Sequence, residues 1–329
     1  MQLTHALFKP LASLLLAACT LLPAAALAQA WPGKQPIKLV VVFPPGGSVD
    51  QVTRILAPVL QQRLGQAVVV DNKGGASGSI GAAAVAASPP DGYTFAMVFD
   101  THGVNPSLIP NLPFDTKRDL TAVSLIGTGA MVISTVATSP YKTFADLVAA
   151  AKGAGGKGVS YGSIGSGSLG HLALTMLAKG NGLDLVHVPY RGGGPLINDA
   201  VAGHVPVAVS SIFLAKPHVD SQRLRPLAVT TSQRSAILPG VPTVAESGFA
   251  GFDAPAWWAV LAPAKTPADI VKRMNDEINA ALKLPEVAQK LAAQGIDIHS
   301  GTPAAAQAFI ENQVDLWARV VKANDIKAD

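Results

Sequence analysis

Three glycine- and serine-rich segments carry the groups best suited to binding a small ligand. They are residues 44–48 (PPGGS), 74–79 (GGASGS) and 162–168 (GSIGSGS), each between an expected strand and an expected helix. The first turn of a helix presents unpaired N–H groups and the positive end of the helix dipole, so it attracts anions. Apart from Lys73 the segments bring no positive charge. Each segment alone is also typical of a plain connection, but three together favour a small carboxylate bound by neutral donors.

Two cofactor-binding motifs that use glycine-rich loops fit the sequence poorly. Residues 165–170 (GSGSLG) match the dinucleotide pattern G-x-G-x-x-G, but the next strand ends at residues 189–191 (PYR) without an acid for the ribose. No glycine run is followed by Lys-Ser or Lys-Thr, so a P-loop is excluded. We therefore expect no cofactor.

Hydrolytic and metal chemistry also fit poorly. Ser163 and Ser166 lack the flanking glycines of the nucleophile elbow G-x-S-x-G. The 7 histidines show no zinc-ligand spacing, and the single cysteine excludes a multi-thiolate site. We expect no catalytic residue and no metal.

Four isolated aromatic or histidine residues allow both a structural and a functional interpretation. His187 lies in an apolar strand pattern and is expected to be structural. His171, in the first turn after the third segment, is either a helix cap or a ligand contact. Trp257 and Trp258 could line a cleft, but packing in the core or at a hinge is the favoured interpretation.

The composition is that of a globular protein of about two domains. The chain has 329 residues, of which 49% are hydrophobic and 14% charged, which excludes an intrinsically disordered protein. The net charge of +4 is spread along the chain without a basic block, so nucleic acid is not an expected partner.

The N-terminus is typical of an export signal. An uncharged, Leu- and Ala-rich stretch follows Lys9, and residues 26–28 (ALA) supply the small-x-small cleavage pattern. We expect residues 1–28 to be a signal peptide cleaved after Ala28. Residues 16–19 (LAAC) resemble a lipobox, so lipidation at Cys19 is the alternative. No later stretch has 18 apolar residues, the least expected of a membrane span.

Alternating strand and helix patterns predict two α/β units in series, each with a mostly parallel, doubly wound sheet. Ser48 or Asp50 is expected to be the N-cap of the first helix, and Pro58 is expected to kink or break it. The expected strands are 37–43, 68–70 and 93–99 in the first unit and 130–137, 159–161, 185–189, 205–209 and 227–230 in the second.

The C-terminal part is expected to be helical and to pack back on the first unit. Thr266 is expected to cap one helix, and residues 302–303 (TP) begin another. The second unit is then an insertion with two crossings, near residues 128–132 and 254–260. The expected lobes are 29–129 with 256–329, and 130–255.

A series of short motifs then indicates a family. Each motif is weak alone, but they occur in order along essentially the whole mature chain. They are Trp31-Pro32, Phe43-Pro44-Pro45-Gly46-Gly47 with Asp50, Pro90-Asp91-Gly92-Tyr93, Asn105-Pro106, Leu112-Pro113-Phe114-Asp115, Tyr161-Gly162-Ser163, His187-Val188-Pro189-Tyr190 and Val241-Pro242-Thr243-Val244. The chain resembles the Bug, or TctC-like, family: extracytoplasmic substrate-binding proteins of tripartite tricarboxylate transporters.

The resemblance implies a type II periplasmic-binding-protein fold, with two α/β lobes, two crossing strands and a cleft that closes on a carboxylated solute. It implies a periplasmic, monomeric protein whose partners are its ligand and membrane permease subunits. The residues it places around the ligand, joined by candidates from the loop patterns, are Gly46, Gly47, Ser48, Asp50, Ala76, Ser77, Gly78, Thr101 and His102 of the first lobe and Ser163, Ser166, Gly167, Ser168, His171 and Ser210 of the second.

One departure from the family pattern bears on the ligand. The family often carries acids in a segment V-D-x-x-F-D, whereas this chain has Pro206 and Ser210 at the acidic positions. An ammonium group would lose its counter-charge there, so a plain or hydroxylated carboxylate, mono- or dicarboxylate, aliphatic or aromatic, is expected rather than an amino acid. The alternatives are a secreted α/β hydrolase and a carboxylate sensor that docks to a membrane receptor.

Overall fold

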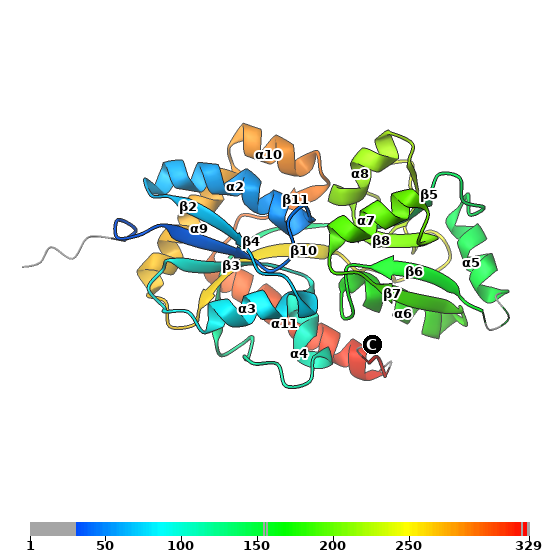
Figure 1. Ribbon diagram of the computed structural model, residues 1–329, viewed down its shortest axis with the longest axis horizontal. Helices are drawn as coiled ribbons and strands as arrows, with labels where there is room; N and C mark the ends of the chain where they lie inside the picture. Colours follow the sequence, from blue (N-terminus) through cyan, green and yellow to red (C-terminus); the bar gives the residue numbers. More distant parts are fainter. Residues whose placement is uncertain (1–30, 154, 156, 324, 328–329) are drawn as a thin grey trace, which may run out of the picture.

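The structure is a computed structural model that describes residues 31–327 except 154, 156 and 324. The expected signal peptide, with Cys19 and Ala28, lies outside the described residues. Two lobes lie along the longest axis of the molecule (Figure 1), and each is built on its own β-sheet. No helix of the described part is long and apolar enough to span a bilayer.

The first sheet is mostly buried and mixes parallel and antiparallel strands. Its strands are β1 (Ile37–Val41), β2 (Val68–Asn72), β3 (Thr94–Phe99), β4 (Leu120–Gly129), β10 (Ala256–Pro263) and β11 (Ile296–Ile298). They lie in the order β11-β4-β10-β3-β1-β2. β1 is parallel to β2 and β3, as expected of βαβ units, whereas β10 is antiparallel to both β3 and β4.

The second sheet repeats this plan. Its strands are β5 (Met131–Val136), β6 (Val159–Ser163), β7 (Leu185–Pro189), β8 (Val207–Ser211) and β9 (Leu224–Val229). They lie in the order β7-β6-β8-β5-β9, with β6 parallel to β7 and β8 and β5 antiparallel to β8 and β9. In each lobe, the strand that enters from the other lobe, β10 in the first and β5 in the second, is antiparallel to both of its neighbours.

Helices cover both sheets. Those of the first lobe are α2 (Ser48–Leu64), α3 (Ser79–Ala86), α4 (Thr101–Leu108), α9 (Ala268–Leu282), α10 (Pro285–Ala292) and α11 (Pro303–Ala323), with a short 3-10 turn η1 (Ala76–Gly78). Those of the second are α5 (Phe144–Lys152), α6 (Leu169–Asn181), α7 (Gly193–Ala202) and α8 (Ile212–Asp220). As expected, the C-terminal helices pack on the first lobe, α9 against α2 and β4 and α11 against α4 and β4.

Thr230 ties together the two chain segments that pass between the lobes. β4 ends at Gly129 and β5 begins at Met131, while the second passage lies between β9 and β10. Thr230 Oγ1 accepts the Met131 N–H at 3.1 Å and donates to Ala254 O at 2.8 Å, and it is completely buried. The passages lie near the expected crossings, and the bonds to Thr230 hold them side by side.

Two expected helix caps were wrong: the N-cap of α2 is Gly47 rather than Ser48 or Asp50, and no side chain caps this helix. Pro58 does not break α2, which runs from Ser48 to Leu64. Because Pro58 and Arg54 are solvent-exposed, water can satisfy the carbonyl that loses its partner. Thr266 does not cap α9, which begins at Ala268; the Thr266 hydroxyl is buried without a partner among the described residues.

The interpretation of Trp257 and Trp258 as core residues is confirmed. Both lie on β10 and are at most 1% exposed. Trp258 packs on Phe99 with ring centroids 5.0 Å apart, and Trp257 packs on Phe309 at 5.8 Å. The crossing strand is therefore anchored in the first lobe by its largest side chains.

The close packing of α3 on β1 generates a test of this fold. A Cβ at Gly81 would lie 2.6 Å from Lys73 O and 3.0 Å from Val42 Cα, both backbone atoms that cannot yield cheaply. Gly81→Ala should therefore lower the free energy of unfolding by about 1–3 kcal/mol in urea titrations. The control is Gly180→Ala in α6, where a Cβ meets nothing within 4 Å; it should raise stability by up to about 1 kcal/mol. Equal effects would contradict the packing.

Candidate ligand-binding site

The segment after β1 is shaped by Asp50, in the first turn of α2. The Gly46 N–H donates to Asp50 Oδ2 at 2.9 Å. Arg54 Nε donates to both carboxylate oxygens at 3.0 Å, and Asn72 Nδ2 donates to Oδ1 at 3.0 Å. Burial alone would raise the pKa of Asp50, but these hydrogen bonds outweigh it and lower the pKa. Asp50 therefore organises this segment from within the first lobe.

The segment after β2 contacts the second lobe directly. Ala76 and Ser77 have φ of 44° and 53°, a left-handed conformation that costs an ordinary residue roughly 1–2 kcal/mol. Ser77 Oγ donates to Ser166 O of the second lobe. Asn105 Nδ2 donates to Ser77 O at 3.0 Å from α4. Contacts from both lobes thus stabilise an otherwise unfavourable turn.

The segment after β6 is organised by its own side chains. Ser163 Oγ accepts the Gly165 N–H at 3.2 Å and the Ser168 hydroxyl at 3.0 Å. Ser168 caps α6 by accepting the His171 N–H at 3.3 Å. His171 Nδ1 accepts the Gly167 N–H at 3.1 Å, so this ring nitrogen carries no proton. These polar groups shape the segment.

His187 on β7 joins this network. Its Nε2 lies 2.7 Å from Ser163 Oγ, and its ring stacks on that of His171 with centroids 4.0 Å apart. A serine beside a histidine is an element of hydrolase sites. Ser163, however, has no exposed surface, and its hydroxyl also contacts Gly165 and Ser168. The pair supports the backbone of the segment.

A small cavity lies between the lobes; we call it the inner cavity. Its volume is about 10 Å³ in this structure, the room of roughly one water molecule. It is lined by Phe43, Gly47, Ser48, Val49 and Phe99 of the first lobe and by Ile164, Gly193, Ser211 and Leu214 of the second.

The N-terminal ends of helices from both lobes meet at the inner cavity. Gly47 and Ser48 begin α2, Gly193 begins α7, and Ser211 is the N-cap of α8. The Ser211 side chain does not cap its own helix, and its buried Oγ has no partner among the described residues. Helix dipoles and an unused hydroxyl therefore favour an anion here, and no described residue adds a cationic side chain to the wall.

A larger outer groove adjoins the inner cavity along the line where the lobes meet. It has a volume of about 840 Å³ and shares Phe43 and Ile164 with the inner cavity. Its other lining residues are Pro44, Pro45, Asn72, Gly74, Gly75, Ala76, Ser77 and Ile80 of the first lobe and Gly165, Ser166, Pro189, Tyr190 and Arg191 of the second. Arg191 is the charged residue in this wall.

Asp100, which no sequence pattern indicates, lies between the lobes at the end of β3. It has no exposed surface, and burial raises the pKa of its carboxyl well above 3.8. The N–H groups of Leu169, which begins α6, and of Thr101 offset this only in part. Neither carboxyl oxygen has a hydrogen bond of good geometry among the described residues. Asp100 is therefore an inter-lobe contact that prefers to be protonated.

Thr101 and His102 lie in α4 and line neither compartment. Thr101 Oγ1 and His102 Nε2 are buried without a partner among the described residues. The His102 ring stacks on Phe114, with centroids 6.0 Å apart and planes 7° apart. His102 thus anchors the loop after α4.

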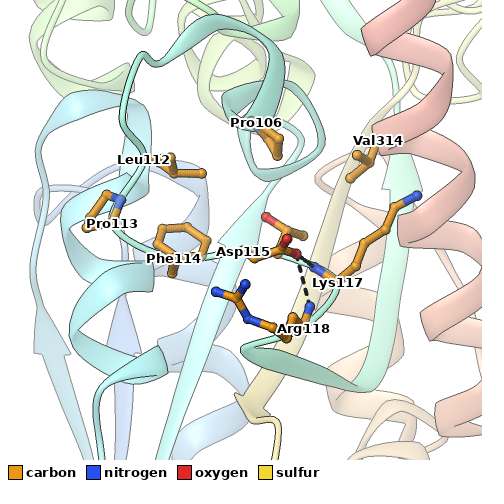
Figure 2. A pocket seen from close by; sticks show the side chains of 9 residues that line it. Pro106, Leu112, Pro113, Phe114, Asp115, Lys117, Arg118 and Val314 are labelled. Atoms are coloured by element: carbon orange, nitrogen blue, oxygen red, sulfur yellow. Dashed lines mark hydrogen bonds between the residues drawn. The ribbon is translucent and has the colours of Figure 1, made fainter.

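That loop borders a separate hollow of about 580 Å³, shown in Figure 2. Its walls come from the first lobe alone, from Pro106 of α4, residues 112–118 and Val314 of α11. Asp115 accepts the backbone N–H groups of Lys117 and Arg118, drawn as dashed lines in Figure 2. Closure of the lobes cannot enclose a solute in this hollow, so it is not the candidate site.

The structure brings together only part of the expected set. Of the expected residues, Gly47 and Ser48 line the inner cavity, and Ala76, Ser77 and Ser166 line the outer groove. The residues that line neither compartment are Gly46, Asp50, Gly78, Thr101, His102, Ser163, Gly167, Ser168, His171 and Ser210.

Among the lining residues outside the expected set, three bear most on ligand binding: Ser211, Gly193 and Arg191. Ser211 takes the place of Ser210, because successive strand residues point to opposite faces. Gly193 and Arg191 line the inner cavity and the outer groove, respectively. The run Tyr190-Arg191-Gly192-Gly193-Gly194, another glycine segment after a strand, is the sequence signal that would have found them.

Comparison with known proteins identifies the family. The family described as "Tripartite tricarboxylate transporter family receptor" (TctC) matches residues 52–326. The chain belongs to this family. BugT of Bordetella pertussis is 37% identical over 295 residues, 89% of this chain and 90% of that protein. A solved "periplasmic transporter" superposes with a TM-score of 0.87 at 36% identity, and R. palustris Rpa4515 with adipate with 0.86 at 32%; each comparison covers 91% of this chain and 100% of the other.

The TctC chain is thus a periplasmic solute-binding protein and not an enzyme. The two-lobed periplasmic-binding-protein fold expected from the sequence is confirmed, and the hydrolase alternative is excluded. The pair formed by the buried Ser163 and the half-buried His187 is therefore structural in this protein.

The stacked, buried His102 predicts an acid-sensitive stability. Burial lowers the pKa of His102 to about 4. Below about pH 6.5 the His102 imidazole binds a proton in the unfolded chain but not in the folded protein. The free energy of unfolding therefore falls toward pH 4, by about 2 kcal/mol at pH 5. His102→Gln should remove this loss in urea unfolding at pH 7 and 5, and His299→Gln, at an exposed histidine, should retain it. Equal pH dependence in His102→Gln and the wild type would refute this role.

Asp100 predicts the opposite pH dependence. Because its folded pKa is raised, the folded protein keeps a proton that the unfolded chain loses above about pH 4, and stability falls as pH rises. Asp100→Asn should therefore be more stable than the wild type at pH 7, with a difference that shrinks toward pH 4. Asp50→Asn, which loses hydrogen bonds to a carboxylate of lowered pKa, should be less stable than the wild type at pH 7. A pH-independent effect of Asp100→Asn would show that its carboxyl does not titrate as stated.

Proposed function

We propose that this protein captures a small organic carboxylate between its lobes and delivers it to the membrane permease subunits of a tripartite tricarboxylate transporter. The observation that carries the proposal is the inner cavity, where the N-terminal ends of α2, α7 and α8 meet beside the unpartnered Ser211 hydroxyl. The adipate bound to the related Rpa4515 supports the same ligand class.

Neutral donors suit a protein that must release its cargo. A carboxylate gains about 1.5–3 kcal/mol from each charge-assisted hydrogen bond, so a few of them support micromolar binding, roughly −8 kcal/mol. Among the described residues, the wall of the inner cavity contains no lysine, arginine or histidine. The ligand is therefore held by groups whose bonds water can replace when the lobes separate.

Contacts across the lobe boundary support closure as the signal for delivery. Ser77 Oγ bonds to Ser166 O, and a Cβ at Gly192 would lie 3.3 Å from Pro44 Cδ. The inner cavity is nearly filled in this conformation, so a solute larger than water must enter while the lobes are apart. A ligand that touches both lobes stabilises the closed state, which the permease then distinguishes from the open one.

The lining residues favour an acid without an ammonium group. No aspartate or glutamate lines the inner cavity or the outer groove among the described residues. A free amino acid would therefore bury its ammonium charge unpaired. We propose in addition that export follows cleavage after Ala28, with lipidation at Cys19 as the alternative, and that the mature protein acts as a monomer.

Ser48 offers the sharpest test of the carboxylate site. Ser48→Asp adds a negative charge at the N-terminus of α2, where an acid is compatible with the helix but repels a carboxylate ligand. Isothermal titration calorimetry with simple mono- and dicarboxylates should show micromolar binding to the wild type and a loss of about a hundredfold or more in Ser48→Asp.

The matched control is Ser48→Asn, which has nearly the same shape without the charge. It should lose less than about tenfold in affinity. Equal weakening by the two variants with the fold intact would place the carboxylate elsewhere. Failure of the wild type to bind any carboxylate, or tight binding of aspartate or glutamate, would contradict the proposed function.

A further inference from the structure

The outer groove carries one uncompensated positive charge. Arg191 is the charged residue of its wall and is solvent-exposed, and no ion pair or hydrogen bond joins its side chain to another described residue. The turn that carries it lies close to the first lobe, since a Cβ at Gly192 would be 3.3 Å from Pro44 Cδ. Arg191 is therefore placed where the two lobes meet.

The neighbouring polar groups are engaged elsewhere. Tyr190 Oη donates to Asp199 Oδ2 at 2.9 Å, and this carboxylate also faces His204. Asn72 donates to Phe43 O and to Asp50. No aspartate or glutamate is among the described residues that line the groove, so the guanidinium of Arg191 stays free to bind an anion.

The groove continues the inner cavity. Phe43 and Ile164 line both compartments, and Pro44, Ile80 and Pro189 add apolar surface to the groove wall that also contains Arg191. An acid whose carboxylate occupies the inner cavity would extend its carbon chain past Phe43 and Ile164. A mainly apolar wall with one free cation fits a molecule that carries a second negative charge away from its first carboxylate.

We propose that Arg191 binds a second anionic group, so that the solute is a dicarboxylate or an acid with another anionic terminus. The proposal rests on the proposed function, because the first carboxylate must occupy the inner cavity. Arg191 then determines specificity for acids with two anionic groups over monocarboxylates. Its guanidinium binds the second anionic group at the boundary between the lobes.

Calorimetry on a matched ligand series tests this role. The titrants are linear α,ω-dicarboxylates of four to eight carbons and the monocarboxylates of the same lengths. In the wild type at least one dicarboxylate should bind about tenfold more tightly than its monocarboxylate. Arg191→Gln should weaken that dicarboxylate by about fivefold to tenfold and change the monocarboxylates by less than about twofold.

The control is Arg319→Gln, which removes an exposed arginine of α11 outside the groove. It should leave both ligand classes unchanged, which separates a local contact from an effect of net charge. Equal weakening of both classes by Arg191→Gln, or equal affinity of the wild type for both, would overturn the role of Arg191 and leave the proposed function standing. If no acid of either class binds the wild type, the proposed function itself fails.

Discussion

The structure depends on where the strands of two sheets end. β1 and β3 of the first lobe and β6, β7 and β8 of the second are all followed, at their carboxyl ends, by segments that face the other lobe. In open α/β sheets ligands bind at these ends, because the next helix begins there and presents its free N–H groups. Two such sheets face each other here, so helix N-termini from both lobes meet at one cavity, which therefore suits an anion without a cationic side chain.

The polar side chains around this cavity divide into two groups by task. Asp50, Ser163, Ser168 and His171 bond to the backbone of their own segments. These hydrogen bonds fix the conformation of the glycine-rich turns, which leaves the N-terminal N–H groups of the following helices accessible. Ser211 and Arg191 have no partner among the described residues and face the inner cavity and the outer groove. In this protein the polar side chains in and next to the three glycine-rich segments shape the backbone of the site. Ser211 and Arg191, which lie outside those three segments, have side chains available to contact a ligand.

Polar and ionisable groups of the two lobes are in contact at the boundary between them. Ser77 and Asp100 of the first lobe meet Ser166 and Leu169 of the second, while Thr230 keeps the two passages between the lobes together. Asp100 is buried between the lobes, and this burial raises the pKa of its carboxyl. A binding protein must reopen to deliver its ligand, and contacts of modest strength suit that need.

The sequence by itself determined the two α/β units, the C-terminal return to the first lobe, the burial of Trp257 and Trp258, and the glycine-rich segments that surround the site. These features follow from strand and helix periodicity and from glycine, which act over a few residues. Only the tertiary structure decided that Ser211 rather than Ser210 faces the cavity, that Asp100 lies between the lobes, and that Asp50 and His171 bond inward. Those outcomes depend on strand register and on partners far away in the chain, and local spacing carries no information about either.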